Sequence, residues 1–205
     1  GIEPQRIAEA VAADGFDPAA ISAIVLTHAH ADHAGGAAAL SRLTGAKVLG
    51  LRETADYVSN GDTEAISLRS AIQAGIYPPD YRFEACAVDP VHDGETIAIG
   101  ELSLRVVETP GHSSGHASFV LERDGRSLLF SGDLIFRGGH VSLQSTWDCR
   151  LDQYKSSVRR IAGMNIDSLF PGHLTFLFHD ARSHIQAAIA EFDSLAIPKN
   201  IIGHS

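Results

Sequence analysis

Apolar positions along the chain follow two periods, and short apolar runs alternate with longer amphipathic stretches. Apolar residues three or four positions apart predict helices, whereas compact or alternating apolar runs predict strands. Because predicted strands and helices alternate, the pattern favours an α/β fold. The expected helices are 4–13, 34–43, 180–192 and one whose buried face carries Leu151, Tyr154, Val158 and Ile161, and the expected strands are 21–26, 46–51, 96–99, 102–107, 117–122, 127–131 and 167–170.

Residues 52–90 differ in pattern from the rest of the chain. Two helical patterns are followed by Pro78-Pro79 and by aromatic residues, with no strand-like run between them. This composition predicts an inserted helical lid rather than part of a sheet. A chain of 205 residues is close to the size of one large domain. We therefore expect a single domain over 1–205 that carries a lid at about 52–90.

Charge and cysteine content narrow the range of partners and compartments. The 16 basic and 25 acidic residues give a net charge of −9, which disfavours nucleic acid as a partner because phosphate binding needs clustered Lys and Arg. The chain contains no apolar run long enough to span a membrane. Cys86 and Cys149 are too few for a disulfide scaffold, although a single bridge stays open. We expect a cytoplasmic protein that acts on a small molecule.

Histidine is the unusual residue, with 11 in the chain. Four polar segments containing histidine or aspartate follow predicted strands, and small residues flank them. Strand ends are where α/β scaffolds place reactive side chains, because the chain turns there and side chains project from the sheet edge. The segments are His28-Ala29-His30-Ala31-Asp32-His33, Gly111-His112, Gly132-Asp133 and Gly172-His173.

The first segment has the spacing of a metal site. Alternate residues of an extended loop point to the same side, so His28 and His30 can hold one cation, while Asp32 and His33 turn away and can hold a second. Such mixed nitrogen and oxygen ligands suit zinc, iron or manganese, and Asp133 is an isolated acid that can bridge two cations. One histidine alone is more often a core or capping residue. Together, however, these polar groups need a cation to be tolerated in a core.

The segments THAHADHAGG, TPGHSSGH, FSGD and FPGH, in this order, resemble the metallo-β-lactamase superfamily over nearly the whole chain. The spacings between the last three motifs are similar to those of the glyoxalase II and lactonase branch. The resemblance implies an αββα sandwich with two metal ions at one edge. It also implies that His28, His30 and His112 bind the first metal, that Asp32, His33 and His173 bind the second, and that Asp133 bridges the two.

This resemblance implies a dinuclear metal-dependent hydrolase. A hydroxide bridging two divalent ions would attack an ester, thioester or lactone carbonyl of a small molecule. Zinc is the favoured metal, with iron or manganese as alternatives. Asp32 and Asp133 are the candidate catalytic residues, and Asp32 is expected to carry the proton to the leaving atom.

Four further residues are candidate substrate contacts. Phe136, Arg137 and His140 follow the bridging aspartate, where related proteins line their pockets, and Tyr77 belongs to the predicted lid. His116 is instead expected to support the structure around the site.

Departures from the family pattern keep other interpretations open. Only 27 residues precede His28, fewer than family members usually carry, so the first sheet is expected to be incomplete, and its exposed edge leaves a homodimer open. One alternative is a mononuclear iron oxidoreductase resembling persulfide dioxygenases, although 138–144 lacks their glycine-arginine-threonine-aspartate segment. The other is a non-catalytic metal-binding relative. A β-lactamase is disfavoured because those enzymes usually replace the bridging aspartate with cysteine or serine.

Overall fold

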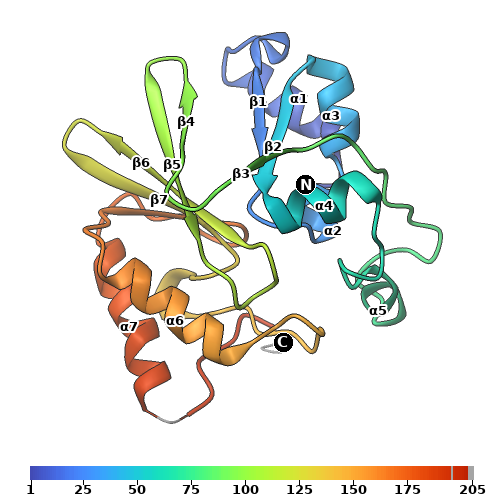
Figure 1. The fold of residues 1–205 in the computed structure, drawn as a ribbon. Helices are drawn as coiled ribbons and strands as arrows, with labels where there is room; N and C mark the ends of the chain where they lie inside the picture. Colours follow the sequence, from blue (N-terminus) through green and yellow to red (C-terminus); the bar gives the residue numbers. More distant parts are fainter. Residues whose placement is uncertain (195, 203–205) are drawn as a thin grey trace. The chain divides into compact units, whose positions relative to one another are not determined.

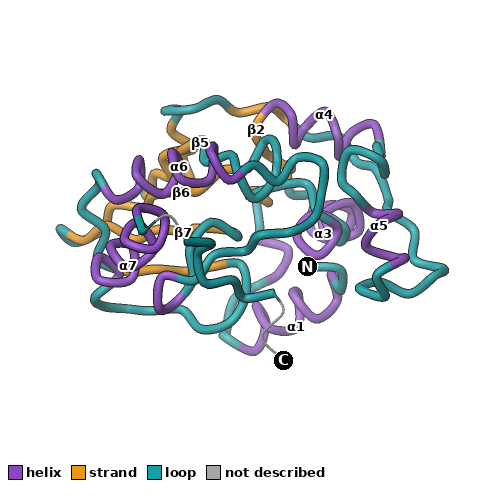
Figure 2. The backbone as a smooth tube through the Cα atoms, turned by 90° about the horizontal axis from the view of Figure 1, so that it is seen from below, coloured by secondary structure: helices purple, strands orange, loops and turns teal. Residues whose placement is uncertain are grey.

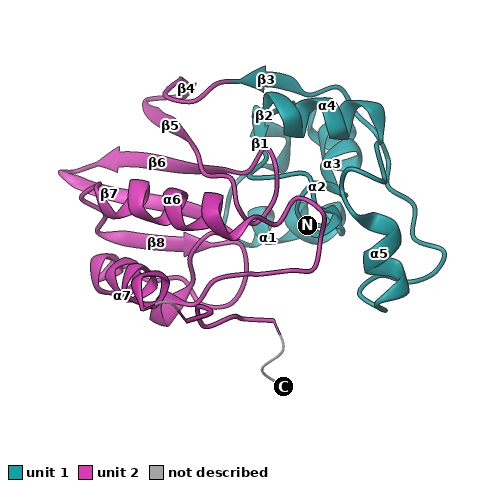
Figure 3. Cartoon of the chain, turned by 60° about the horizontal axis from the view of Figure 1, so that its bottom comes forward, with its two compact units in different colours: residues 1–91 teal, residues 92–205 magenta. Residues whose placement is uncertain are grey.

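The computed structural model describes residues 1–194 and 196–202, and it divides the chain into two units, residues 1–91 and 92–205 (Figure 3). The end of the domain predicted over 1–205, at 203–205, lies outside the described residues. Each unit contains one sheet and several helices, and the helices and strands are coloured separately in Figure 2. Each unit also has its own apolar core. The mixed α/β class expected from the sequence is therefore confirmed.

The first unit is built on a parallel sheet with the strand order β1-β2-β3. β1 pairs with β2, and β2 pairs with β3. Helices α3 and α4 pack against the central strand β2 (Figure 1). The elements are α1 (Pro4–Ala13), the 3₁₀-helix η1 (Pro18–Ala20), β1 (Ala23–Val25), α2 (Ala31–Ala34), α3 (Ala37–Thr44), β2 (Lys47–Leu51), α4 (Arg52–Asn60), α5 (Leu68–Gln73) and β3 (Asp89–Val91).

The helix expected over 34–43 is divided into two helices. α2 ends at Ala34 and α3 begins at Ala37, so Gly35 and Gly36 form the break. Glycine is a poor helix former, which explains why two in succession interrupt the pattern. The break lets the polar loop after β1 end in a helical turn of its own, and this turn carries two of the candidate metal ligands.

The prediction for 52–90 is confirmed for its two helices and wrong at its end. α4 and α5 account for the two helical patterns. β3, however, starts at Asp89 and pairs in parallel with β2, so the end of the segment belongs to the sheet. β3 is a short edge strand containing Pro90, and backbone pairing rather than apolar periodicity defines it. The apolar pattern of the sequence therefore gives no signal for this strand.

The second unit contains a five-stranded sheet with the order β4-β5-β6-β7-β8. Neighbouring strands are antiparallel except for β8, which runs parallel to β7. All five strands were expected from the sequence, with ends that differ by one residue at most. The elements are β4 (Thr96–Ile99), β5 (Leu102–Glu108), β6 (Ala117–Arg123), β7 (Arg126–Gly132), the 3₁₀-helix η2 (Arg137–Gly139), α6 (Leu151–Ala162), β8 (Ser168–Pro171) and α7 (Ala181–Asp193).

Two helices cover one face of this sheet. α6 and α7 lie side by side (Figure 1), and both pack on the strand residues Val120, Leu129 and Leu169. Leu151 was expected on the buried face of α6 but is 48% exposed, because it is the first residue of the helix and lies at the margin of the core. The packed helix face holds α6 in place, and α6 carries a tyrosine that matters for the site.

Two further observations concern the described part of the chain. Cys86 and Cys149 are free, so no disulfide joins them. No helix among the described residues is long and apolar enough to cross a membrane.

Candidate metal centre

The first unit presents four candidate ligands on the loop between β1 and α2. We call His28, His30, Asp32 and His33 the first half-site. His28 and His30 precede α2 and are buried, whereas Asp32 and His33 lie in α2 and are half-buried. The first half-site therefore combines an extended loop with the helical turn that follows it.

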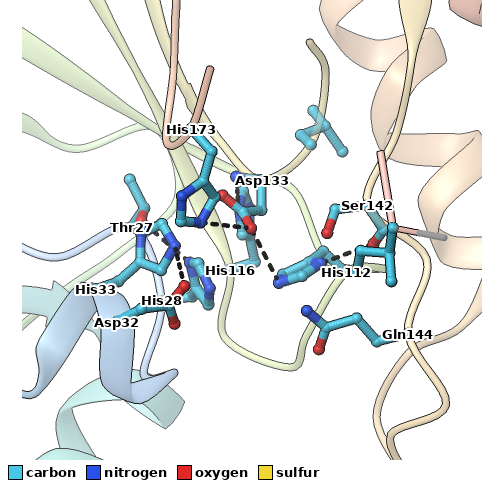
Figure 4. A network of polar contacts seen from close by, with 12 residues as sticks. Thr27, His28, Asp32, His33, His112, His116, Asp133, Ser142, Gln144 and His173 are labelled. Atoms are coloured by element: carbon cyan, nitrogen blue, oxygen red, sulfur yellow. Dashed lines mark hydrogen bonds and ion pairs between the residues drawn. The ribbon is translucent and has the colours of Figure 1, made fainter. Parts of the chain in front are cut away.

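The first half-site is dense in nitrogen and oxygen atoms (Figure 4). The ring centroid of His28 lies 4.7 Å from that of His30 and 4.1 Å from that of His33. The Thr27 hydroxyl lies 3.1 Å from Nδ1 of His28. His33 Nε2 is 3.5 Å from Oδ2 of Asp32. With Nδ1 of His28 engaged by Thr27, its Nε2 is the nitrogen that suits a cation.

Tyr77 bonds to Asp32 in two ways. The Asp32 backbone N–H donates to the Tyr77 hydroxyl oxygen at 3.1 Å, and that hydroxyl donates to Oδ1 of Asp32 at 2.9 Å. Burial raises the pKa of the Tyr77 hydroxyl well above its ordinary value, and the charge of Asp32 raises it further. The hydroxyl therefore keeps its proton at neutral pH and stays a donor to the carboxylate.

A second tyrosine supports the first. The Tyr81 ring stacks on the Tyr77 ring, with centroids 5.3 Å apart and planes inclined by 24°. A Cβ at Gly35 would lie 2.1 Å from the Tyr81 hydroxyl oxygen, so only glycine leaves room for this tyrosine beside α2. The tyrosine pair is thus packed directly against the turn that carries Asp32.

The second unit presents three candidate ligands on three separate loops. We call His112, Asp133 and His173 the second half-site. His112 and Asp133 are buried and His173 is half-buried. Oδ2 of Asp133 lies 3.6 Å from Nε2 of His112 and 3.4 Å from Nε2 of His173, so one carboxylate oxygen faces both imidazoles (Figure 4). Nδ1 of His112 lies 2.8 Å from the backbone carbonyl of Ser142.

Tyr154 of α6 holds the backbone around the second half-site. Its hydroxyl lies 2.5 Å from the Asp133 carbonyl and 2.7 Å from the Leu134 carbonyl, and it accepts the Ser142 N–H at 3.0 Å. The side chain is fully buried. A Cβ at Gly111 would lie 2.3 Å from the Tyr154 Cα, so the residue before His112 must be glycine to pack against α6. Tyr154 therefore contacts the backbone of Asp133 and of Gly111, the residue that precedes His112.

His116 anchors the same aspartate from the other side. Its Nε2 accepts the Asp133 N–H at 3.1 Å, so in the neutral ring Nδ1 carries the hydrogen. Nδ1 lies 2.9 Å from the Thr109 hydroxyl, which in turn lies 3.0 Å from the Ser118 hydroxyl. All of these side chains are buried. Because both ring nitrogens are engaged in this way, His116 supports Asp133, as its expected structural role requires.

The spacing of donor atoms within each half-site fits a bound cation. Two ligand atoms about 2.1 Å from one tetrahedral cation lie about 3.4 Å from each other. The contacts from Asp133 to His112 and His173, and the contact from Asp32 to His33, measure 3.6, 3.4 and 3.5 Å. Metal-binding histidines usually engage their other ring nitrogen with a carbonyl or hydroxyl, and His112 and His28 both do so. The residues therefore fit divalent cations.

The candidate substrate contacts lie in different settings. Arg137 is exposed and His140 is half-buried, whereas Phe136 is fully buried. Tyr77 is 9% exposed and is bonded to Asp32. Sequence reasoning missed Tyr154, whose apolar neighbours in α6 gave the signal of a core residue only.

Comparisons with known proteins point to one family. The family model described as "Metallo-beta-lactamase superfamily" matches residues 1–173. Among solved structures, BJP-1, a subclass B3 metallo-beta-lactamase of Bradyrhizobium japonicum, is similar with a TM-score of 0.71 and 26% identity, over 95% of this chain and 80% of that chain.

The names of several relatives state an activity. The hydroxyacylglutathione hydrolase of Chelativorans sp. (strain BNC1) is 25% identical over 172 residues, which cover 83% of this chain and 54% of that protein. The acyl-coenzyme A thioesterase MBLAC2 of Homo sapiens is 30% identical over 181 residues, which cover 80% of this chain and 62% of that protein. The chain thus spans less than two thirds of the length of either relative.

Proposed function

Because this chain belongs to the metallo-β-lactamase superfamily, we propose that it is a metal-dependent hydrolase whose two half-sites together hold two divalent cations. The single observation that carries the proposal is the second half-site, in which one buried carboxylate oxygen of Asp133 faces two imidazole nitrogens at ligand spacing. In the proposed centre, His28, His30 and His112 would hold one cation, Asp32, His33 and His173 would hold the other, and Asp133 would be a ligand to both.

Zinc is the proposed metal. Five of the seven proposed ligands are imidazoles and two are carboxylates, a donor set that suits zinc, with iron or manganese as alternatives. When bound, the two cations would lower the pKa of a water molecule and polarise a carbonyl group.

The protein's own residues would orient the reaction. Tyr154 and His116 bond to the backbone of Asp133 and fix its position, so its carboxylate would hold the two cations in a defined place. Asp32 would accept the proton released during attack and return it to the leaving atom.

A thioester is the proposed substrate class. Coenzyme A and glutathione are both thiols, so the named activities of the two relatives share the cleavage of an acyl–sulfur bond. An ester or a lactone presents the same carbonyl electrophile and is the second choice. Arg137 and His140 remain proposed substrate contacts, whereas Phe136 could contact substrate only if its cover moved, because it is fully buried.

The test is a hydrolysis assay on protein stripped of metal by a chelator and then reloaded with zinc. The panel contains an acyl-coenzyme A, an acylglutathione, an aryl ester and a lactone, and thiol release or pH change is followed. We expect thioester cleavage that disappears on stripping and returns with zinc. Hydrolysis that is insensitive to stripping would contradict the proposal, and cleavage of the lactone alone would replace the substrate class.

A further inference from the structure

Tyr77 makes two hydrogen bonds to one residue, Asp32, which is a proposed metal ligand. The hydroxyl accepts from the backbone of Asp32 and donates to its side chain, at 3.1 and 2.9 Å. The amide of Asp32 lies in the first turn of α2, where backbone N–H groups have no partner within the helix. The Tyr77 hydroxyl therefore links the main chain of Asp32 to the carboxylate of the same residue in a closed hydrogen-bonded loop.

This hydrogen-bonded loop restricts the orientation of the Asp32 carboxylate. With Oδ1 engaged by Tyr77, Oδ2 is the oxygen that lies beside His33, at 3.5 Å from Nε2. A free aspartate at a helix start would rotate about its side-chain bonds and exchange its two oxygens. A ligand held in one orientation loses less conformational freedom when a cation binds.

We infer that Tyr77 is a positioning residue, which holds Asp32 so that Oδ2 is presented beside His33 for the second cation. The inference rests on the proposed function, since it takes Asp32 and His33 as ligands. It gives Tyr77 a different role from the substrate contact expected from the sequence. A substrate contact would affect the binding of substrate, whereas a positioning residue affects the binding of metal.

The surroundings of Tyr77 suit this role. The side chain is 9% exposed, and its ring is stacked on Tyr81, whose hydroxyl in turn occupies the space left open by Gly35. The Tyr81 hydroxyl is buried and has no hydrogen-bond partner among the described residues. Tyr81 therefore supplies a matched control, because its hydroxyl can be removed from the same stack without loss of a described bond.

The experiment compares Tyr77→Phe with Tyr81→Phe and wild type by zinc titration of the stripped proteins, with bound metal counted by elemental mass spectrometry. We expect Tyr77→Phe to bind its first zinc normally and its second about 10- to 100-fold more weakly, the usual effect of removing a partner of a metal ligand. Tyr81→Phe should keep both affinities. With zinc saturating, KM for the substrate should stay unchanged in Tyr77→Phe.

A double-mutant cycle separates positioning from a general effect on folding. If Tyr77 acts through Asp32, adding Tyr77→Phe to Asp32→Asn should weaken the second zinc no further than Asp32→Asn alone. Additive losses, equal affinities in Tyr77→Phe and wild type, or a raised KM with normal zinc binding would overturn the inference. Wild-type protein that binds fewer than two zinc ions would instead overturn the proposed function, and the inference with it.

Discussion

The two half-sites bring nitrogen and oxygen ligand atoms together in opposite ways. The first takes its four ligands from six consecutive residues, and one tyrosine from a distant segment bonds directly to its carboxylate. The second takes three ligands from three loops, and its tyrosine, Tyr154, bonds to backbone groups rather than to a ligand side chain among the described residues. When the ligands are adjacent in the sequence, as in the first half-site, their spacing is already fixed, and only the orientation of single side chains has to be set. When the ligands come from separate loops, as in the second half-site, the backbone of those loops must be held in place.

This contrast predicts where each half-site is most vulnerable. In the second half-site, removing the Asp133 side chain, which two imidazoles face, should strongly reduce metal binding. Disrupting the packing beneath its loops should strongly reduce the stability of the fold. In the first half-site, single contacts should adjust metal affinity with little effect on folding. The following substitutions test this, from the largest expected effect to the smallest.

Asp133→Ala should reduce bound metal well below two ions per chain and hydrolysis to the uncatalysed rate. The reason is that one carboxylate oxygen faces both His112 and His173. Elemental analysis and the hydrolysis assay measure both quantities. Asp167→Asn, at another aspartate of the second unit that accepts a backbone N–H, is the control and should keep its metal. Full metal content and activity in Asp133→Ala would refute the bridging assignment.

Gly111→Ala should destabilise the fold by about 3 kcal/mol or more, since the added methyl would meet the α6 backbone. The Cβ would lie 2.3 Å from the Tyr154 Cα, at a φ of +136°. Gly125→Ala is the matched control, because Gly125 also has positive φ but nothing lies within 4 Å of its Cβ. It should cost only about 1 kcal/mol. Denaturant unfolding compares the two, and equal losses would show that the close packing under His112 is unimportant.

Tyr154→Phe should lower the free energy of unfolding by about 2 kcal/mol, because the Ser142 N–H and the carbonyls of Asp133 and Leu134 lose a buried partner. Thermal or denaturant unfolding measures the loss. Tyr81→Phe, which removes a hydroxyl without a hydrogen-bond partner among the described residues, should leave stability nearly unchanged. If both variants unfold alike, the hydroxyl of Tyr154 does not hold these loops.

Thr27→Val should weaken the first zinc by about tenfold and leave folding almost unaffected. The Thr27 hydroxyl is the group beside Nδ1 of His28, and valine removes it at nearly constant volume. Zinc titration gives the affinity, and Thr96→Val, at an exposed position of β4, serves as the control. An unchanged first affinity would mean that the ring of His28 is oriented by other contacts.

The same contrast explains how much the sequence predicted. The ligands of the first half-site are readable because six adjacent residues carry them, and the strands of the second unit are readable from their apolar runs. The pairing of Tyr77 with Asp32 is not, since 45 residues separate them and no periodicity joins them. Tyr154 was hidden for another reason. Its ring does pack in the core, and only its hydroxyl reveals the second role.

The predictions for the end of segment 52–90, where β3 lies, and for the burial of Leu151 were wrong for related physical reasons. Strand pairing at a sheet edge is decided by the backbone of the neighbouring strand, and the burial of a first helical residue depends on where the core ends. Neither is encoded in local apolar pattern.

Metal content per chain tests the central proposal most directly. Protein purified without chelator, then loaded with zinc and freed of excess, is analysed by elemental mass spectrometry against protein concentration. The account predicts about two zinc ions per chain. One iron ion per chain would favour a mononuclear oxidoreductase, and no bound metal even after loading would contradict a metal-dependent hydrolase.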